Sequence, residues 1–197
     1  MEELVNGEIQ YVEMLTELQN NIIDPLEDRL ERLPRENGFL CCSPAPFISE
    51  EDSSAIFDSL APILAANRDL SMTLSERFLD WHEESTIGDV IVDWSHNINV
   101  AYTRYCENYD HASQLYGRAM QVPEFADFIE EASEGCRCSV QAVLVAPISR
   151  IARYRLLLGE LVKCTAEDHP DAASLGDAAD KLRRVAEELQ RAAFTPR

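Results

Sequence analysis

The feature that most constrains the fold is a segment of apolar residues spaced as on one face of a helix. Between residues 144 and 170, apolar side chains recur three, four and seven positions apart, the period of an α-helix. They are Leu144, Ile148, Ile151, Leu158 and Leu161. Pro147 falls early in this pattern, where it would either kink a helix already begun or open a new one. No segment of useful length alternates as a strand does, so the sequence predicts an all-α fold.

The first third of the chain predicts two helices separated by a loop. The first is expected over residues 2–33, bent near Asp24 because Pro25 follows. Residues 34–50 hold prolines and a glycine without helical period and are expected to form the loop. Ser49 is then the expected N-cap of a second helix, which would bend at Pro62 and end near Trp81.

The rest of the chain predicts further helices, which together form an elongated bundle of about six long helices and a few short ones. Helices are expected over residues 90–120, 123–132 and 135–165. A closing helix carries a near-heptad stripe of apolar residues. Its members are Leu175, Ala178, Leu182, Val185, Leu189 and Ala192.

The net charge and the cysteines limit which partners and which cellular compartment are expected. Seventeen basic against thirty-six acidic residues give a net charge of −19, which argues against a nucleic-acid partner or an anionic membrane surface. The acidic surface favours encounter with a protein bearing basic patches, or is simply solvated. No apolar run is long enough to cross a membrane, so direct membrane insertion is not expected. The six cysteines fit no zinc pattern, and reduced thiols in the cytoplasm are the favoured interpretation.

Motifs of covalent catalysis are missing from the sequence. There is no phosphate-binding glycine loop, no dinucleotide fingerprint and no nucleophile elbow, and the four histidines fit no metal motif. We therefore expect neither a cofactor nor a metal, and we expect no enzyme that makes or breaks covalent bonds.

Three charged residues stand out against the apolar patterns. Glu8 occupies a gap in the apolar stripe of the first helix, where it would either lie in a solvated first turn or face a group that pairs with it. Arg150 and Arg153 share one helical face near the centre of the 135–165 helix. Arg150 could be an intramolecular ion-pair partner or a contact to another protein.

Two segments carry a family resemblance. "PISRIARYRLLLGEL" resembles the third conserved region of Dbl-homology domains, P-[IV]-Q-R-[IV]-x-[KR]-Y-P-L-L-L-x-E-L, and departs from it at Ser149 and Arg155. "ELVNGEIQYVEMLTELQNNIIDPL" is similar to the first conserved region, although Gly7 replaces the usual Thr. Other pieces follow in the family's order, so the chain from Leu4 to Ala193 is identified as a member.

The resemblance implies a function and a domain organisation. Dbl-homology domains are exchange factors that bind a Rho- or Rac-family small GTPase, remodel its switch regions, displace Mg²⁺ and release GDP, without covalent chemistry. Residues 1–197 would be one such domain, a fragment of a larger protein in which membrane recruitment lies outside this chain. The pleckstrin-homology domain that usually follows is not present in these residues.

The resemblance also implies four GTPase-binding positions. Glu8 would engage switch I, and Arg153 would be directed to the switch surface. Gln190 stands where an Asn usually bonds switch II, and Val145 stands where the family distinguishes Rac-like GTPases from related ones. The departures Gly7, Ser149, Arg155 and Gln190 keep a second hypothesis open, a helical scaffold with little or no exchange activity.

Overall fold

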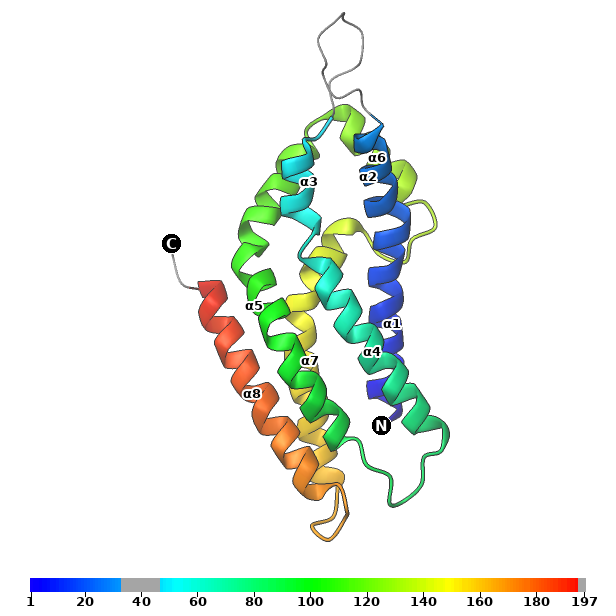
Figure 1. Ribbon diagram of the computed structural model, residues 1–197, viewed down its shortest axis with the longest axis vertical. Helices are drawn as coiled ribbons and strands as arrows, with labels where there is room; N and C mark the ends of the chain where they lie inside the picture. The colour runs from blue at the N-terminus through cyan, green and yellow to red at the C-terminus, as the bar shows by residue number, and fades with distance from the viewer. Residues whose placement is uncertain (33–46, 195–197) are drawn as a thin grey trace, which may run out of the picture.

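The structure is a computed structural model, which describes residues 1–32 and 47–194, without the side chains of residues 190 and 192–194. Within these ranges all regular elements are helices, which confirms the predicted all-α fold. They form an elongated bundle with α6, α2 and α3 at one end and the α7–α8 connection at the other (Figure 1). The helices are α1 (Glu2–Leu18), α2 (Asp24–Glu31), α3 (Glu50–Phe57), α4 (Leu60–Leu79), α5 (Gly88–Ala119), α6 (Pro123–Ala132), α7 (Val140–Cys164) and α8 (Ala172–Phe194).

The irregularity expected near Asp24 is present. A π-helical turn, Gln19–Ile23, separates α1 from α2, and the backbone N–H of Asp24 bonds the carbonyl of Gln19, five residues back. Pro25 follows directly, lacks an N–H and clashes with the carbonyl four residues earlier, so the regular hydrogen-bond ladder cannot pass through it. The loop expected over residues 34–50 lies mostly outside the described residues.

The prediction of one helix from Ser49 to Trp81 with a bend at Pro62 is wrong. Ser49 does cap a helix, since its Oγ accepts a hydrogen bond from Asp52 N at 3.0 Å. That helix is α3, which ends at Phe57, and α4 begins at Leu60. Pro62 lies in the first turn of α4, where its missing N–H has no intrahelical partner to lose.

Helix α7 begins later than predicted. It starts at Val140 rather than near Gly135, because Gly135 takes a positive φ of 83° and Ser139 caps the helix through Ala142 N at 3.3 Å. Pro147 lies inside α7, so it stands in a helix already begun rather than at the opening of a new one. The short helix expected at 123–132 is confirmed as α6, with Pro123 in its first turn.

Helix α8 packs along α5 and α7 and is fixed at its start by a buried carboxylate. Five members of the predicted stripe, Leu175, Ala178, Leu182, Val185 and Leu189, are buried, whereas the side chain of Ala192 lies outside the description. Asp171, just before α8, accepts hydrogen bonds from Ile87 N at 2.8 Å and Gly88 N at 3.0 Å. This contact joins the start of α8 to the start of α5.

Close packing at this junction requires a glycine. A Cβ added at Gly88 would lie 2.4 Å from the backbone nitrogen of Leu175, a distance that atoms cannot adopt. The two helices can therefore approach this closely only without a side chain at position 88.

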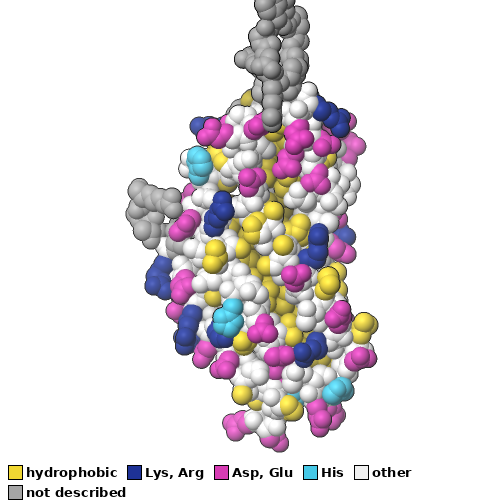
Figure 2. Space-filling view, in the orientation of Figure 1, with side chains coloured by type: hydrophobic (Ala, Val, Ile, Leu, Met, Phe, Trp, Pro, Cys, Tyr) yellow, Lys and Arg dark blue, Asp and Glu magenta, His cyan; other side chains and the backbone are white. Residues whose placement is uncertain are grey.

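The surface matches the acidic composition. Asp and Glu side chains spread over the face in Figure 2, with fewer Lys and Arg, and apolar side chains gather along its middle. Among the described residues, no helix is long and apolar enough to cross a membrane.

Candidate functional site

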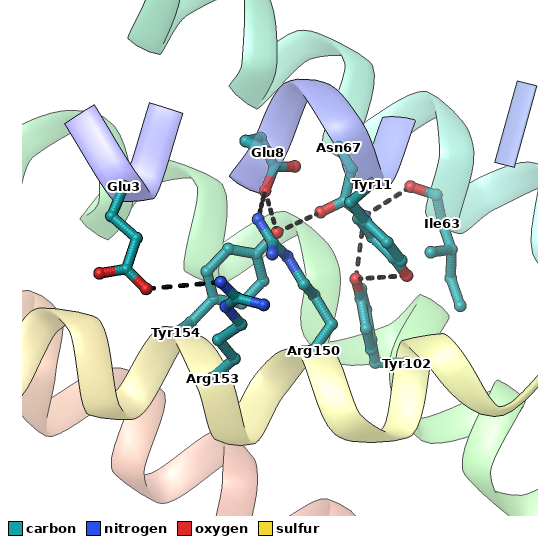
Figure 3. A network of polar contacts seen from close by, with 9 residues as sticks. All are labelled: Glu3, Glu8, Tyr11, Ile63, Asn67, Tyr102, Arg150, Arg153 and Tyr154. Atoms are coloured by element: carbon teal, nitrogen blue, oxygen red, sulfur yellow. Dashed lines mark hydrogen bonds and ion pairs between the residues drawn. The ribbon is translucent and has the colours of Figure 1, made fainter. Parts of the chain in front are cut away.

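The structure buries Glu8 completely and pairs it with helix α7. The side chain is 0% exposed, and its Oε2 accepts a hydrogen bond from Arg150 Nη2 at 2.7 Å (Figure 3). The Tyr154 hydroxyl donates a second hydrogen bond to the same oxygen. The interpretation of Glu8 as part of a solvated first turn is therefore wrong, because a partner 142 positions away holds the carboxylate inside the bundle.

The pair belongs to a larger polar network that joins four helices. The Tyr154 hydroxyl lies 3.0 Å from Asn67 Oδ1 on α4, and Asn67 Nδ2 donates to the Tyr102 hydroxyl on α5 at 2.9 Å. Tyr11 on α1 completes the network, 3.3 Å from the Tyr102 hydroxyl. Asn67 also donates to the Ile63 carbonyl at 2.7 Å, one helical turn before it. Polar groups from α1, α4, α5 and α7 thus bond one another where an aliphatic core would otherwise lie, with Glu8 Oε1 and Arg150 Nε left without a partner among the described residues.

Burial and charge act in opposite directions on Glu8. Removal from water raises the pKa of its carboxyl, whereas the Arg150 charge and the hydrogen bonds from Tyr154 and Arg150 lower it. Burial also raises the pKa of the Tyr11, Tyr102 and Tyr154 hydroxyls, so these groups stay neutral around pH 7.

The Arg150 guanidinium is held among aromatic rings as well as by the carboxylate. Its central carbon lies 4.5 Å from the Tyr154 ring centroid and 5.1 Å from that of Tyr11. Burial by itself lowers the pKa of Arg150, but Tyr154 and Glu8 raise it, with a net increase, so the group stays charged. Of the two alternatives for Arg150, the structure shows the intramolecular ion pair.

A groove lies on the surface between α1 and α7, beside the buried pair. Its volume is about 570 Å³, and Gly7 and Tyr11 line its α1 side. Ser149, Arg150 and Arg153 line its α7 side. Arg150 is thus the residue that reaches from this groove to the Glu8 carboxylate.

The four positions implied by the family resemblance lie in different settings. Arg153 is 55% exposed at the groove, with Nη2 3.4 Å from Glu3 Oε1 (Figure 3). Val145 is exposed on α7, two turns from Arg153. Glu8 lies behind the groove, and the side chain of Gln190, a residue of α8, is outside the description. The structure therefore brings Glu8 and Arg153 to the same pair of helices, α1 and α7.

Tyr154 and Asn67 were not identified from the sequence as members of the network around Glu8. Tyr154 is buried in the core, and its hydroxyl also bonds the carboxylate. Asn67 was not selected at all, although it is fully buried within the predicted helix after Ser49. The available signals were Asn67 within an apolar pattern and Tyr11 one turn after Glu8.

Comparison with known proteins agrees with this architecture. A family model for the RhoGEF domain matches residues 1–190. "Guanine exchange factor for Rac 30" of Dictyostelium discoideum is 35% identical over 142 residues, 72% of this chain and 9% of that protein. The human "Neuroepithelial cell-transforming gene 1 protein" is 31% identical over 181 residues, 90% of this chain and 30% of that protein.

Solved structures of the same class show the same fold. The linker-DH/PH domains of p115-RhoGEF, 23% identical, superpose with a TM-score of 0.80 over 98% of this chain and 55% of that one. Human RhoA in complex with a DH/PH fragment of PDZRHOGEF includes a chain that is 16% identical, with a TM-score of 0.78 over 98% of this chain and 52% of that one.

The bundle places the first conserved region on α1 and the third on α7, and these two helices are in contact. This arrangement is that of the Dbl-homology class. The chain belongs to the RhoGEF domain family. It spans 9% and 30% of the length of the two relatives described.

Proposed function

We propose that this domain is a guanine-nucleotide exchange factor for a Rho-family small GTPase. The match of residues 1–190 to the RhoGEF family carries the proposal. A relative named as an exchange factor for Rac and a structural neighbour in complex with RhoA support it. The domain would act within a longer protein in the cytoplasm, with membrane recruitment assigned to other regions of that protein.

Exchange needs no covalent chemistry by the domain. The domain binds the nucleotide-free GTPase more tightly than the nucleotide-bound form, and by linkage it lowers the affinity for nucleotide by the same factor. The binding energy is used to remodel the switch segments, displace Mg²⁺ and open the phosphate site. No cofactor or metal of the domain takes part.

The groove between α1 and α7 is the proposed contact surface. Arg153 is exposed there and offers a guanidinium to the switch surface of the GTPase. Val145 is exposed on the same helix, two turns before Arg153, and would contribute to the choice of GTPase. Glu8 would receive switch I, and Gln190 would bond switch II from α8.

The second candidate function is a helical scaffold without exchange activity. One observation favours it: Glu8 is 0% exposed and bonded within the domain, so it contacts a GTPase only if the groove opens toward it. The scaffold and the exchange factor share the fold and differ in whether nucleotide release is accelerated.

The test is the release of a fluorescent GDP analogue from a panel of Rho, Rac and related GTPases, with and without the domain. We expect accelerated release from at least one member and a loss of about tenfold or more in Arg153→Ala. Lys163→Ala is the matched control, since it removes an exposed cation from the far end of the same helix, where the side chain is 70% exposed. A folded domain that accelerates none of the panel would establish the scaffold instead.

A further inference from the structure

Glu8 is held through only one of its two oxygens. Arg150 and Tyr154 both donate to Oε2, whereas Oε1 is buried and has no hydrogen-bond partner among the described residues. A buried acceptor without a partner is costly, and because such atoms are rare in native proteins, each needs an explanation, of which a functional role is one. The Nε of Arg150 is likewise buried without a partner among the described residues. Oε1 is therefore the oxygen of Glu8 that could still accept a hydrogen bond, and a donor from another protein reaches it only if the groove opens toward it, because Glu8 is 0% exposed.

The residues around Glu8 are those of the groove. Gly7 and Tyr11, which flank it on α1, line the groove together with Arg150. Arg150 is 6% exposed, and its guanidinium contacts the carboxylate on one side and two tyrosine rings on others. A partner that enters the groove meets Arg150 and then the carboxylate that Arg150 holds.

Gly7 provides the space that Arg150 occupies. A Cβ at position 7 would lie 3.3 Å from Arg150 Nη1 and 3.6 Å from Nη2, so the guanidinium would have to move by a few tenths of an ångström. A glycine within a helix costs stability relative to alanine. Its presence next to the buried pair is explained by the room it leaves for Arg150.

From this geometry we infer that Arg150 and Tyr154 are positioning residues for exchange, which keep the Glu8 carboxylate ionised and turned so that Oε1 faces the GTPase. The inference rests on the proposed exchange function, and it adds two residues that act through Glu8 rather than through contact with the nucleotide or with Mg²⁺. Gly7 permits the arrangement without taking part in a hydrogen bond.

The inference makes the charge of Glu8 depend on Arg150. Of the titratable groups that face Glu8, Arg150 and Tyr154 come from α7, Tyr102 from α5 and Tyr11 from α1, while α4 contributes the neutral Asn67. The pKa values of the three tyrosines and of Arg150 are all raised, so these four groups keep their charge state around pH 7 and Glu8 is the acid of this cluster whose charge Arg150 can affect. Burial raises the pKa of Glu8 and the charge of Arg150 lowers it. When Arg150 is removed, the pKa of Glu8 therefore rises further.

The first arm of the test uses the domain alone. The Glu8 carboxyl is titrated by carbon-13 NMR in the wild type, Arg150→Met and Arg150→Lys, with its signal assigned by its loss in Glu8→Gln. We expect the Glu8 midpoint to move to higher pH in Arg150→Met and to return toward the wild-type value in Arg150→Lys, which keeps the charge. An unchanged midpoint in a folded Arg150→Met would overturn the inference, whatever the domain does to a GTPase.

The second arm is the pH profile of exchange. Below the Glu8 midpoint, exchange by Arg150→Met should fall about tenfold for each pH unit, whereas Lys163→Met should follow the wild type. Tyr154→Phe and Gly7→Ala should shift the profile in the same direction by less. Faster exchange in Arg150→Met would mean that Arg150 withholds Glu8 from the GTPase, and it would overturn the inference.

The two arms separate failure of the inference from failure of the proposed function. A wild-type domain that accelerates no GTPase contradicts the exchange function, and the titration still decides whether Arg150 keeps Glu8 ionised. A wild type that is active, with Arg150→Met unchanged in both arms, contradicts only the positioning roles.

Discussion

The bundle is held together in two different ways on its two sides. Helix α8 contributes aliphatic side chains to the core along α5 and α7, whereas α1 combines its buried aliphatic residues with a polar network shared with α4, α5 and α7, made of a buried ion pair, three tyrosines and an asparagine. The apolar contact stabilises by removing surface from water and is indifferent to pH. In the polar contact, the cost of removing charged groups from water offsets much of the favourable free energy, but the contact fixes one particular arrangement of side chains. A domain that only had to fold would gain little from the second design.

The largest expected effect comes from removing one member of the buried pair. Arg150→Met leaves the Glu8 charge buried without its counter-ion, which we expect to cost about 4 kcal/mol of unfolding free energy at pH 7. Urea denaturation followed by circular dichroism measures it, with Lys163→Met as the exposed control. A loss below about 1 kcal/mol would mean that Glu8 reaches water on its own, and the contrast between the two sides would disappear.

On the apolar side, Leu182→Ala should cost about 3 kcal/mol, because it removes a fully buried side chain and leaves a cavity. The cost should be the same at pH 5.5 and pH 8, since no charge changes. A Leu182→Ala cost that varied with pH would show that the α8 contact is coupled to the polar network.

The pH dependence of Arg150→Met sharpens the comparison. Glu8 has a folded pKa above its ordinary value of 4.5, and loss of Arg150 raises it further. A raised pKa of an acid means that the folded state binds the proton more tightly, so the cost is present above the folded pKa and fades as the pH falls below it. We therefore expect the deficit of Arg150→Met to shrink between pH 7 and pH 5, by up to about 1.4 kcal/mol per pH unit.

This expectation is checked by unfolding the wild type, Arg150→Met, Glu8→Gln and the double variant Glu8→Gln/Arg150→Met at each pH. The double variant and the single variant Glu8→Gln both lack the carboxyl, so the difference in stability between these two should not change across the range. A deficit of Arg150→Met that stays constant with pH would show that lost packing, rather than the unpaired charge, causes it.

The apolar side could be predicted from the sequence and the polar side could not. The spacing of Leu175, Ala178 and Leu182 predicts which face of α8 is buried, because an α-helix repeats every 3.6 residues. Glu8 interrupts such a pattern, which signals that it is unusual, but nothing near it in the sequence identifies Arg150. Pairing across more than a hundred residues depends on how helices pack, and periodicity does not encode it.

Helix ends show the same limit. Ser49 was predicted as a cap from its own side chain and the acids after it, which are local signals. The break between α3 and α4, and the start of α7 at Ser139 instead of Gly135, were missed because a proline or glycine is compatible with several positions near a helix end. Gly88 gave no signal at all, since its need for a missing side chain comes from the backbone of α8.

The smallest expected change in stability comes from a second ion pair between α1 and α7, one turn from the first. Arg153 and Glu3 are 55% and 69% exposed, so Arg153→Ala should change the unfolding free energy by less than about 0.5 kcal/mol. The two arginines lie three positions apart on one helix and carry the same charge, and they differ in burial. If the proposed function is correct, Arg153→Ala loses exchange with its stability intact, whereas Arg150→Met loses both together. Equal stability losses in Arg153→Ala and Arg150→Met would mean that the two arginines contribute alike to the stability of the domain, although one is exposed and the other is buried.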